Sequence, residues 1–182
     1  MLRLAHAILT GLIGAALLHL IIVFALPEFT GRDAYSRVLA LGPAGSFHPL
    51  GKSGAAGPLA PDDPFVQASV CAYDVTASPR VVTASGDPAF WSFAVFDKAA
   101  NEVFSLSDRS IENGGLAAIL ATPAQAARLR KADPGLMERV ILVETAGNEG
   151  YVVLRSLAPH ASLEPEALDF LKSARCDAFT PR

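Results

Sequence analysis

The sequence predicts an α+β protein in which an N-terminal transmembrane helix precedes an antiparallel, sandwich-like β-rich domain with two or three helices. Three observations predict this class. An uncharged apolar run opens the chain, short stretches that are apolar on both faces recur between turn residues, and two later segments space their apolar residues as helices do. The 182 residues leave room for one ordinary domain besides the membrane segment.

The apolar run covers Leu4 to Leu26, which is 23 positions without a formal charge. At about 1.5 Å per residue this makes a helix of roughly 34 Å, enough to cross a hydrocarbon core of about 30 Å. A cleaved signal peptide is the alternative, with Val23 and Ala25 as the small residues before the cut, but cleavable apolar regions usually span only about 7–15 residues. We therefore predict an uncleaved signal anchor over 1–27.

The charges beside this run bear on orientation. Arg3 is the only charged residue before Pro27, and Arg32 and Arg37 follow on the other side. A short basic tail is easily retained inside, and large domains translocate largely regardless of charge. We expect an inner (cytoplasmic) membrane protein with its N-terminus inside and its C-terminal domain in the periplasm or exterior.

The part after Pro27 carries 14 basic and 18 acidic side chains and no basic cluster. Nucleic acid is therefore not an expected partner.

Small residues recur within the anchor. Ala7, Gly11 and Ala15 are four positions apart, and His19 extends their row. Small residues at this spacing let two membrane helices approach closely, so these four are candidates for the packing face of a helix-mediated homo-oligomer. The alternative is an anchor in which this composition has no partner.

Residues 28–62 are expected to form a juxtamembrane helix and a tether. The stretch "GRDAYSRVLAL" has helical spacing, and Gly42 to Pro64 is rich in glycine and proline. Its "GKS", residues 51–53, invites comparison with a phosphate loop. That motif requires a glycine where Ser46 stands, and Pro49 lacks a backbone N–H. We therefore predict that this segment is a tether between the anchor and the exterior domain, not a phosphate-binding loop.

The exterior β-rich domain is expected over 63–182. "DPFVQASV", residues 63–70, reads as a short helix that runs into the extended "CAYDV". "FWSFAVFD", residues 90–97, is apolar on both faces, as in a central strand, and "KAAN" follows as a hairpin connection. Further strands are predicted over 80–85, 102–108, 116–122, 139–145 and 151–159, and helices over 123–132 and 163–176.

These segments together carry a resemblance. "RDAYSR" after the anchor, "DPFVQASVCAYDV", "WSFAVFDKAANEVFSLSDR", "YVVLRSL" and the closing "SARC" resemble, in order and spacing, the bacterial family called domain of unknown function 1254. The resemblance implies a small membrane-anchored envelope protein, often encoded beside a sister protein of related sheet architecture. It implies no established reaction and no catalytic residues.

The chemistry-bearing side chains form no recognisable catalytic or metal motif. The histidines are isolated and neither cysteine has a second within four residues, so we expect no metal and no cofactor. The weak catalytic candidates are Asp74, Asp108 and Arg109, which end predicted strands. Asp74 and Asp108 would form a carboxylate pair only if their strands were neighbours.

Cys71 and Cys176 are the only cysteines, and both lie outside the predicted membrane span. An even count in an oxidising compartment is typical of a structural disulfide, which would join the first extended segment to the last helix. Two buried free thiols, or thiols that pair between subunits, are the alternatives.

Two hypotheses of function follow. The first is a non-enzymatic, single-pass envelope protein whose exterior domain binds a partner, such as the sister protein or another envelope component. The alternative is an envelope hydrolase that uses acidic residues such as Asp74 or Asp108. A pocket that holds two buried carboxylates would favour the second hypothesis.

Overall fold

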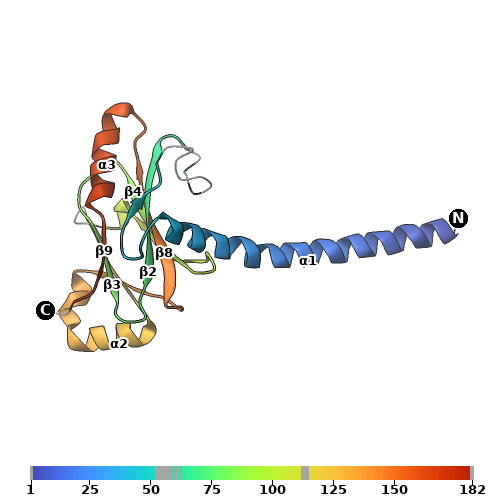
Figure 1. The fold of residues 1–182 in the computed structure, drawn as a ribbon, viewed down its shortest axis with the longest axis horizontal. Coiled ribbons are helices and arrows are strands. Elements are labelled where there is room, and N and C mark those ends of the chain that lie inside the picture. Colours follow the sequence, from blue (N-terminus) through green and yellow to red (C-terminus); the bar gives the residue numbers. More distant parts are fainter. Residues whose placement is uncertain (1, 52–58, 60, 62, 112–114, 181–182) are drawn as a thin grey trace.

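The fold is two β-sheets packed face to face, with one long helix leaving the sandwich (Figure 1). The computed structural model describes residues 2–51, 59, 61, 63–111 and 115–180. One sheet has the order β1 (His48–Pro49), β2 (Val66–Asp74), β8 (Glu149–Leu157), β4 (Trp91–Asp97), β5 (Glu102–Ser107), and the other the order β7 (Ile141–Glu144), β6 (Leu116–Ala121), β3 (Arg80–Ala84), β9 (Arg175–Ala178). The helices are α1 (Leu2–Leu41), α2 (Pro123–Ala132) and α3 (Glu164–Ser173), with short 3-10 turns at Asp108–Ser110, Pro134–Glu138 and Ala161–Leu163. The predicted fold class is confirmed.

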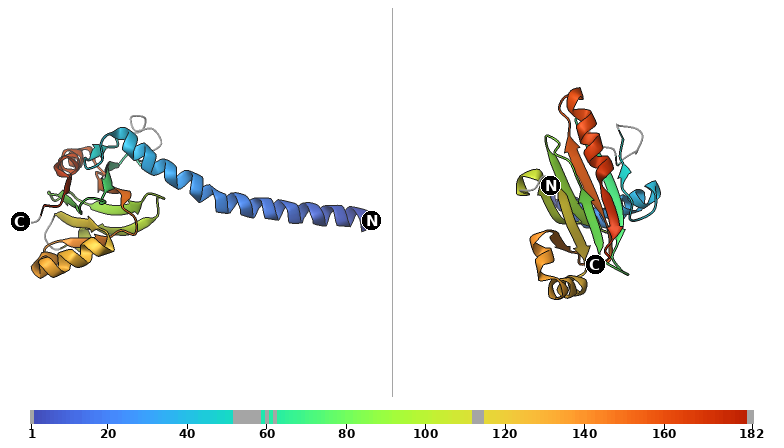
Figure 2. Two further views of the ribbon diagram at one scale, coloured as in Figure 1. Left: turned by 60° about the horizontal axis from the view of Figure 1, so that its bottom comes forward. Right: turned by 90° about the vertical axis from the view of Figure 1, so that its left-hand side faces the viewer.

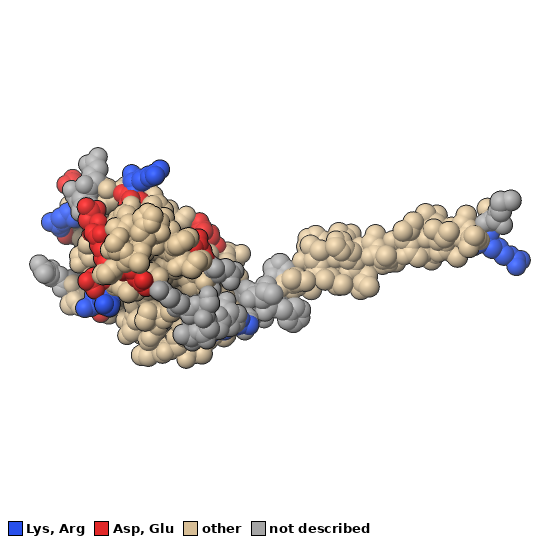
Figure 3. All heavy atoms as spheres, turned by 90° about the horizontal axis from the view of Figure 1, so that it is seen from above, with Lys and Arg blue, Asp and Glu red and all other residues tan. Residues whose placement is uncertain are grey.

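The helix α1 runs for 40 residues without interruption. Its part from Leu2 to Leu26 has a mean hydropathy of 2.5, and none of its most apolar stretch is buried. Figure 3 shows the apolar part of α1 without charged side chains except near its N-terminal end. Such a helix suits a membrane anchor or a signal sequence. The short helix expected after the membrane segment is the continuation of the same helix.

The C-terminal end of α1 packs on the five-stranded sheet. Tyr35 and Val38 are buried there against the outward-facing side chains of β2 and β8, among them Val70 and Val153. Figures 1 and 2 show that α1 leaves this sheet on the side away from the four-stranded sheet. The helix is therefore held directly by the sandwich.

The predicted tether is partly built into the sheet. The N–H of Gly45 donates to the Ala72 carbonyl at 2.8 Å, β1 pairs with β2, and the N–H of Leu50 donates to the Ala68 carbonyl at 2.9 Å. The expectation of a loop from Gly42 onward is wrong for His48 and Pro49, which form β1, whereas residues 42–47 are irregular as predicted. Phe47 and Leu50 pack their side chains on the sandwich. Residues 52–58, 60 and 62 of the predicted tether lie outside the described residues.

The short helix expected over residues 63–70 is also wrong, because most of this segment belongs to β2. Gln67, Ser69 and residues 71 and 73 face the other sheet, whereas Ala68 and Val70 face α1. Both backbone edges of the strand are paired, with β1 on one side and β8 on the other. This pairing satisfies the backbone groups that an isolated short helix would leave exposed.

The main core lies between the sheets. Trp91, Phe93 and Val95 of β4 meet Val82 of β3 and Leu120 of β6, and all five side chains are almost fully buried. The outer face of the four-stranded sheet is also covered, since Ile119 and Ala121 pack against α2. Helices on both outer faces explain why the strands are apolar on both sides.

The two later helices follow from local signals. Thr122 and Gln125 form a capping box around Pro123 at the start of α2, as predicted for residues 123–132. The last helix is shorter than the predicted 163–176, because α3 ends at Ser173 and the chain continues as β9. β9 pairs with β3, which lies far away in the chain, so the residues around 175–178 alone do not predict this strand.

Candidate functional site

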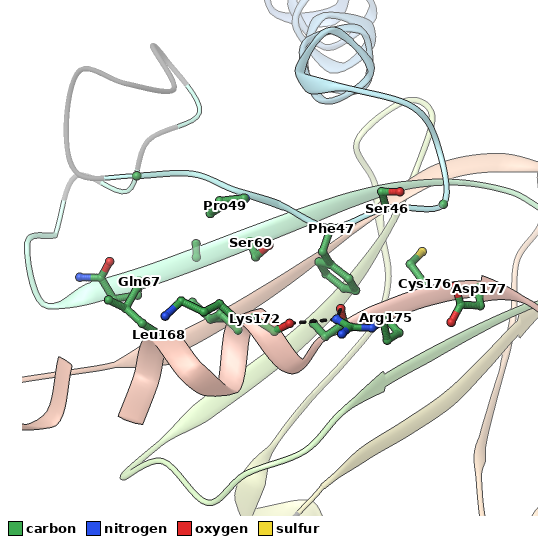
Figure 4. A pocket seen from close by; sticks show the side chains of 15 residues that line it. Ser46, Phe47, Pro49, Gln67, Ser69, Leu168, Lys172, Arg175, Cys176 and Asp177 are labelled. Carbon is green, nitrogen blue, oxygen red and sulfur yellow. Dashed lines mark hydrogen bonds between the residues drawn. The ribbon is translucent and has the colours of Figure 1, made fainter. Parts of the chain in front are cut away.

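A cavity of about 580 Å³ opens between the β1–β2 edge of one sheet and α3 with β9 of the other (Figure 4). We call it the groove. This volume lies in the range of ligand-binding clefts, about 300–1,000 Å³. Its lining comes from β1 and the residues before it, from the first half of β2, from the last two turns of α3, and from β9. None of these side chains was a predicted site residue except Cys176.

Two polar side chains of β2 form part of the groove wall. Gln67 is 8% exposed and Ser69 is 2% exposed, and both line the cavity. Among the described residues neither side chain has a hydrogen-bond partner, and neither belongs to the fully buried unpaired polar groups, so their polar atoms remain accessible. Their polar atoms face the cavity, so a bound molecule would be able to satisfy them.

The opposite wall combines apolar and basic side chains. Leu168, Leu171 and the methyl group of Ala174 give it an apolar surface. Lys172 and Arg175 lie along the same wall, where Figure 4 shows them across from β2. The Lys172 ammonium group forms an exposed ion pair with Asp169 at 3.0 Å, which is outside the groove lining.

Arg175 has a structural as well as an electrostatic role. Its Nη1 donates to the carbonyls of Lys172 and Ala174, both at 2.9 Å, and so caps the C-terminal end of α3. Asp177 supplies the carboxylate among the lining residues. The lining therefore holds two cations and one anion, and Asp169 just outside it balances the charge of Lys172.

The disulfide between Cys71 and Cys176 closes one end of the groove. The Cα atoms are 6.7 Å apart, within the usual range of about 4.4–6.8 Å, and both residues are buried. The predicted bond is therefore present in the structure. Gly45 crosses beside it with φ of +87°, where a Cβ atom would lie 3.1 Å from the Arg80 guanidinium group. The positive φ, which side chains rarely adopt, explains the glycine.

The structure does not bring the weak catalytic candidates together. Asp74 ends β2 opposite Glu149, whereas Asp108 follows β5 at the other end of the sheet, with two strands between their own. The condition for a carboxylate pair, neighbouring strands, is not met, because β8 and β4 lie between β2 and β5. Neither residue lines the groove, and Arg109 is an exposed surface residue.

Each candidate carboxylate has a local environment of its own. Asp74 accepts a hydrogen bond from the N–H of Thr76 at 2.7 Å, and hydrogen bonding to Thr76 lowers the pKa of Asp74 below its ordinary value. Asp108 begins a 3-10 turn, and its buried Oδ1 has no hydrogen-bond partner among the described residues. Within the described part of the chain, no group of three or more His, Cys, Asp or Glu side chains could hold a metal ion.

A second polar cluster lies where α1 meets the sheet, and here every group is paired. The Tyr35 hydroxyl donates to Glu149 at 3.2 Å, and the Lys98 ammonium group lies 2.6 Å from the other Glu149 oxygen and 5.4 Å from the centre of the Tyr35 ring. Burial and the charge of Glu149 raise the pKa of Tyr35 to about 12, whereas the hydrogen bond from Lys98 lowers the pKa of Glu149. We call this cluster, with Val38, the junction.

The remaining predicted site residues lie on α1. Ala7, Gly11, Ala15 and His19 share one face of the helix, and all four are exposed in the single chain. Their role in helix packing stays a prediction.

Sequence reasoning missed the groove because it did not recognise β2 as one long strand. Once the strand is known, Gln67 and Ser69 alternate with Cys71 on the inward face, where unpaired polar side chains are rare. That alternation was the available signal. Nothing local indicated the basic residues of α3 and β9, since charges on such segments usually face solvent.

The fold is similar to parts of two solved structures. The VPA0106 protein from Vibrio parahaemolyticus matches 64% of this chain with a TM-score of 0.51 and 16% identity, and an uncharacterised protein from Burkholderia cenocepacia matches 81% with a TM-score of 0.51 and 13% identity. This chain spans 28% and 42% of their respective lengths. At this identity the likeness shows the fold alone. No family model and no curated protein matches the chain.

Proposed function

We propose that this chain is a single-pass envelope protein, anchored in the inner (cytoplasmic) membrane by α1, whose exterior sandwich binds another polypeptide in the groove. The observation that carries the proposal is a cavity with apolar walls in which Gln67 and Ser69, without partners in the described part of the chain, face Lys172 and Arg175. Such a wall is typical of a binding site with a few polar groups that orient its ligand.

The proposed localisation is supported by two features. The apolar stretch Leu2–Leu26 of α1 is long enough to span a bilayer, and the disulfide is typical of an oxidising compartment such as the periplasm. We place the N-terminus inside because Arg3 is the only charged residue before Pro27, and a short basic end is easily retained inside. The small residues of α1, such as Gly11, provide a face on which two anchors would associate.

The kind of partner follows from the resemblance and from the lengths of the similar structures. The resemblance to the domain of unknown function 1254 family implies a sister protein of related sheet architecture. In the two similar structures the matched part makes up 28% and 42% of a longer chain. We propose that a separate polypeptide, such as the sister protein, packs against the sandwich here.

The hydrolase alternative has no observation in its favour, because its two carboxylates lie at opposite ends of the sheet.

Site-specific photo-crosslinking in the intact envelope tests the proposal. A benzophenone side chain at Leu168, in the groove, should give an adduct of protein size, and one at exposed Ala127 on α2 should give none. No adduct at Leu168, or equal adducts at both positions, would contradict a groove that binds a polypeptide. A reporter fused after Arg182 checks the address, since it should be active only if exported. A soluble form that begins near Leu26 would indicate a cleaved signal instead.

A further inference from the structure

The strand β5 ends the five-stranded sheet on the side away from β1 and the groove, and its outer edge pairs with no other described strand. Two backbone bonds of the neighbouring residues show which groups point to that edge. The N–H of Asp97 donates to the Asn101 carbonyl, on the side of β5. The N–H of Leu157 donates to the Phe90 carbonyl, on the side of β8. Along β4, the backbone groups of odd-numbered residues therefore point to β5 and those of even-numbered residues to β8.

The register of β5 then places its free backbone groups. Phe104 and Leu106 lie opposite odd-numbered residues of β4, so their N–H and C=O groups point to β4. Ser105 and Ser107 alternate with them, so their N–H and C=O groups point to the open edge. The extra residue of the β-bulge, Val103, comes before this stretch and leaves it regular. Among the described residues these outward groups have no hydrogen-bond partner.

This stretch is complementary to a second copy of itself. When two copies pair antiparallel with Ser105 opposite Ser107 of the second copy, the outward N–H and C=O groups of both residues bond to each other. The two serine side chains are small and lie side by side on the outer face of the sheet. Leu106 then lies opposite its own copy. Its half-buried side chain packs against the main core and would continue the apolar contact across the interface.

The charges at the two ends of β5 fit the same register. Glu102 begins the strand and Arg109 follows it, and both side chains are exposed. Neither forms an ion pair in the described part of the chain, and Glu102 accepts a hydrogen bond from Ser105 through Oε1 alone, at 2.6 Å. Asp108, beside Arg109, has one oxygen buried within the protein. Antiparallel pairing brings Glu102 of each copy to the end where Arg109 of the other copy lies, and opposite charges across such a pair stabilise it.

The direction of α1 also agrees with a pair of this kind. The two-fold axis between two antiparallel edge strands of one sheet is perpendicular to that sheet. Figure 2 includes a view from the end opposite to α1, in which the strands spread across the picture, so α1 leaves the sandwich roughly along this perpendicular. Rotation about the axis keeps both N-terminal ends on the same side. Two copies would therefore reach one membrane together.

From these observations we infer that two copies of the chain associate through β5, with Ser105 of one copy opposite Ser107 of the other, so that their five-stranded sheets become continuous. This interface goes beyond the proposed function. The groove lies at the other end of the sheet and stays open in the pair.

Disulfide crosslinking in the intact envelope tests the register. Two differently tagged full-length chains are expressed together, one with Ser105→Cys and the other with Ser107→Cys. Opposite residues of the interface would lie about 5.5 Å apart, within reach of a disulfide, whereas same-numbered residues are diagonal neighbours about 7–8 Å apart. We expect the mixed dimer to exceed either same-variant dimer about fivefold. Ser162→Cys, on the exposed 3-10 turn before α3, is the control and should crosslink with neither. Equal yields of all pairs, or an adduct with a different protein only, would overturn the inference.

Ser105→Pro tests the backbone pairing. The Ser105 N–H points to the open edge, so proline removes no backbone bond within the chain but blocks an added strand. We expect the dimer of the full chain in detergent micelles to dissociate at about tenfold higher concentration, with an unchanged melting temperature, as measured by sedimentation and thermal unfolding. A dimer as stable as that of the wild type would contradict pairing through β5.

A charge exchange gives a second test that leaves the backbone unchanged. Glu102→Arg should weaken the dimer about tenfold, because the pair contains this contact twice, and addition of Arg109→Glu should restore it. Lys131→Glu, on exposed α2, is the control and should have no effect. A dimer that is insensitive to these changes but lost in Gly11→Leu would show that the anchors alone associate, and the inference would be wrong.

Discussion

The junction and the groove lie on opposite faces of the same strand, β2. The polar side chains of the junction are hydrogen-bonded to one another, whereas those of β2 in the groove have no partner in the described part of the chain. At the junction, Tyr35, Glu149 and Lys98 satisfy one another, and Val38 is almost completely buried. In the groove, Gln67 and Ser69 have no hydrogen-bond partner in the described part of the chain, and their polar atoms stay accessible from the cavity. The junction therefore has the properties of a structural contact, and the groove those of an incomplete one.

This difference has a direct energetic meaning. Removal of a junction side chain breaks an existing interaction, so it should destabilise the fold. Removal of a polar groove side chain breaks no interaction within the chain, so it should leave the fold intact and weaken only binding. The predictions below separate the two regions by this criterion, in decreasing order of expected effect on the free energy of unfolding.

The largest effect is expected from loss of the disulfide. The bond joins residues 105 positions apart, and removal of a native disulfide typically costs about 2–5 kcal/mol. The double variant Cys71→Ala, Cys176→Ala should therefore unfold at clearly lower urea concentration. Exchange of the β9 amides should rise more than that of the α1 amides, since the bond closes the groove and not the junction. Equal rises in both regions would show that the two regions unfold as one unit.

Gly150→Ala should disrupt the strand beneath the junction. A Cβ atom at this position would lie 2.2 Å from the Phe96 carbonyl oxygen and 2.4 Å from the Tyr73 hydroxyl, which are themselves hydrogen-bonded. Overpacking of this kind costs about 1–3 kcal/mol. Thermal unfolding of Gly147→Ala is the control, because nothing lies within 4 Å of a Cβ there. Equal melting temperatures for the two variants would contradict the close packing at Gly150.

Val38→Ala tests whether α1 is held by the sandwich. Val38 is 1% exposed, and deletion of its two buried methyl groups should destabilise the protein by about 1–2 kcal/mol. Its neighbour Leu39 is 39% exposed, so Leu39→Ala should have a smaller effect although it removes a larger side chain. Urea unfolding monitored by the fluorescence of Trp91 measures both. The reverse order would mean that α1 does not dock on the sheet.

Tyr35→Phe and Ser69→Ala should have opposite effects. The first removes the donor to Glu149 and should cost about 0.5–1.5 kcal/mol, whereas the second removes an unpaired hydroxyl and should be neutral or slightly stabilising. Paired melting curves in the absence of peptide are sufficient for the comparison. A loss of stability in Ser69→Ala would show that its hydroxyl has a partner within the chain.

The smallest effect is the pH dependence of the junction. The lowered pKa of Glu149 means that its carboxylate stabilises the fold at neutral pH and that this contribution disappears as the pH falls below its ordinary value of 4.5. Tyr35 acts at the other end, because its raised pKa gives a contribution that is complete below 10.0 and declines as the pH approaches about 12. Glu149→Gln should flatten the acid limb, and Tyr35→Phe the alkaline limb. An unchanged profile in both variants would contradict their coupling.

The sequence alone determined the elements whose signals are local. The uncharged run predicted the membrane-length helix, the two-faced strand over 90–97 predicted a central position, and the helix predicted over 123–132 coincides with α2. Two cysteines with no others to choose from made the disulfide the simplest pairing. The helix and strand signals depend only on residues close together in the sequence. The disulfide follows from the cysteine count, because two cysteines allow one intramolecular pairing.

Only the tertiary structure decided how distant segments combine. β2 became a strand along its whole length because β1 and β8 pair with it, although "DPFVQASV" begins like a helix. The same pairing docked the presumed tether, separated Asp74 from Asp108, and brought Gln67 and Ser69 opposite Lys172 and Arg175. Backbone hydrogen bonds and buried contacts between residues far apart in the chain outweigh local preference, and a single sequence carries no direct record of which segments will meet.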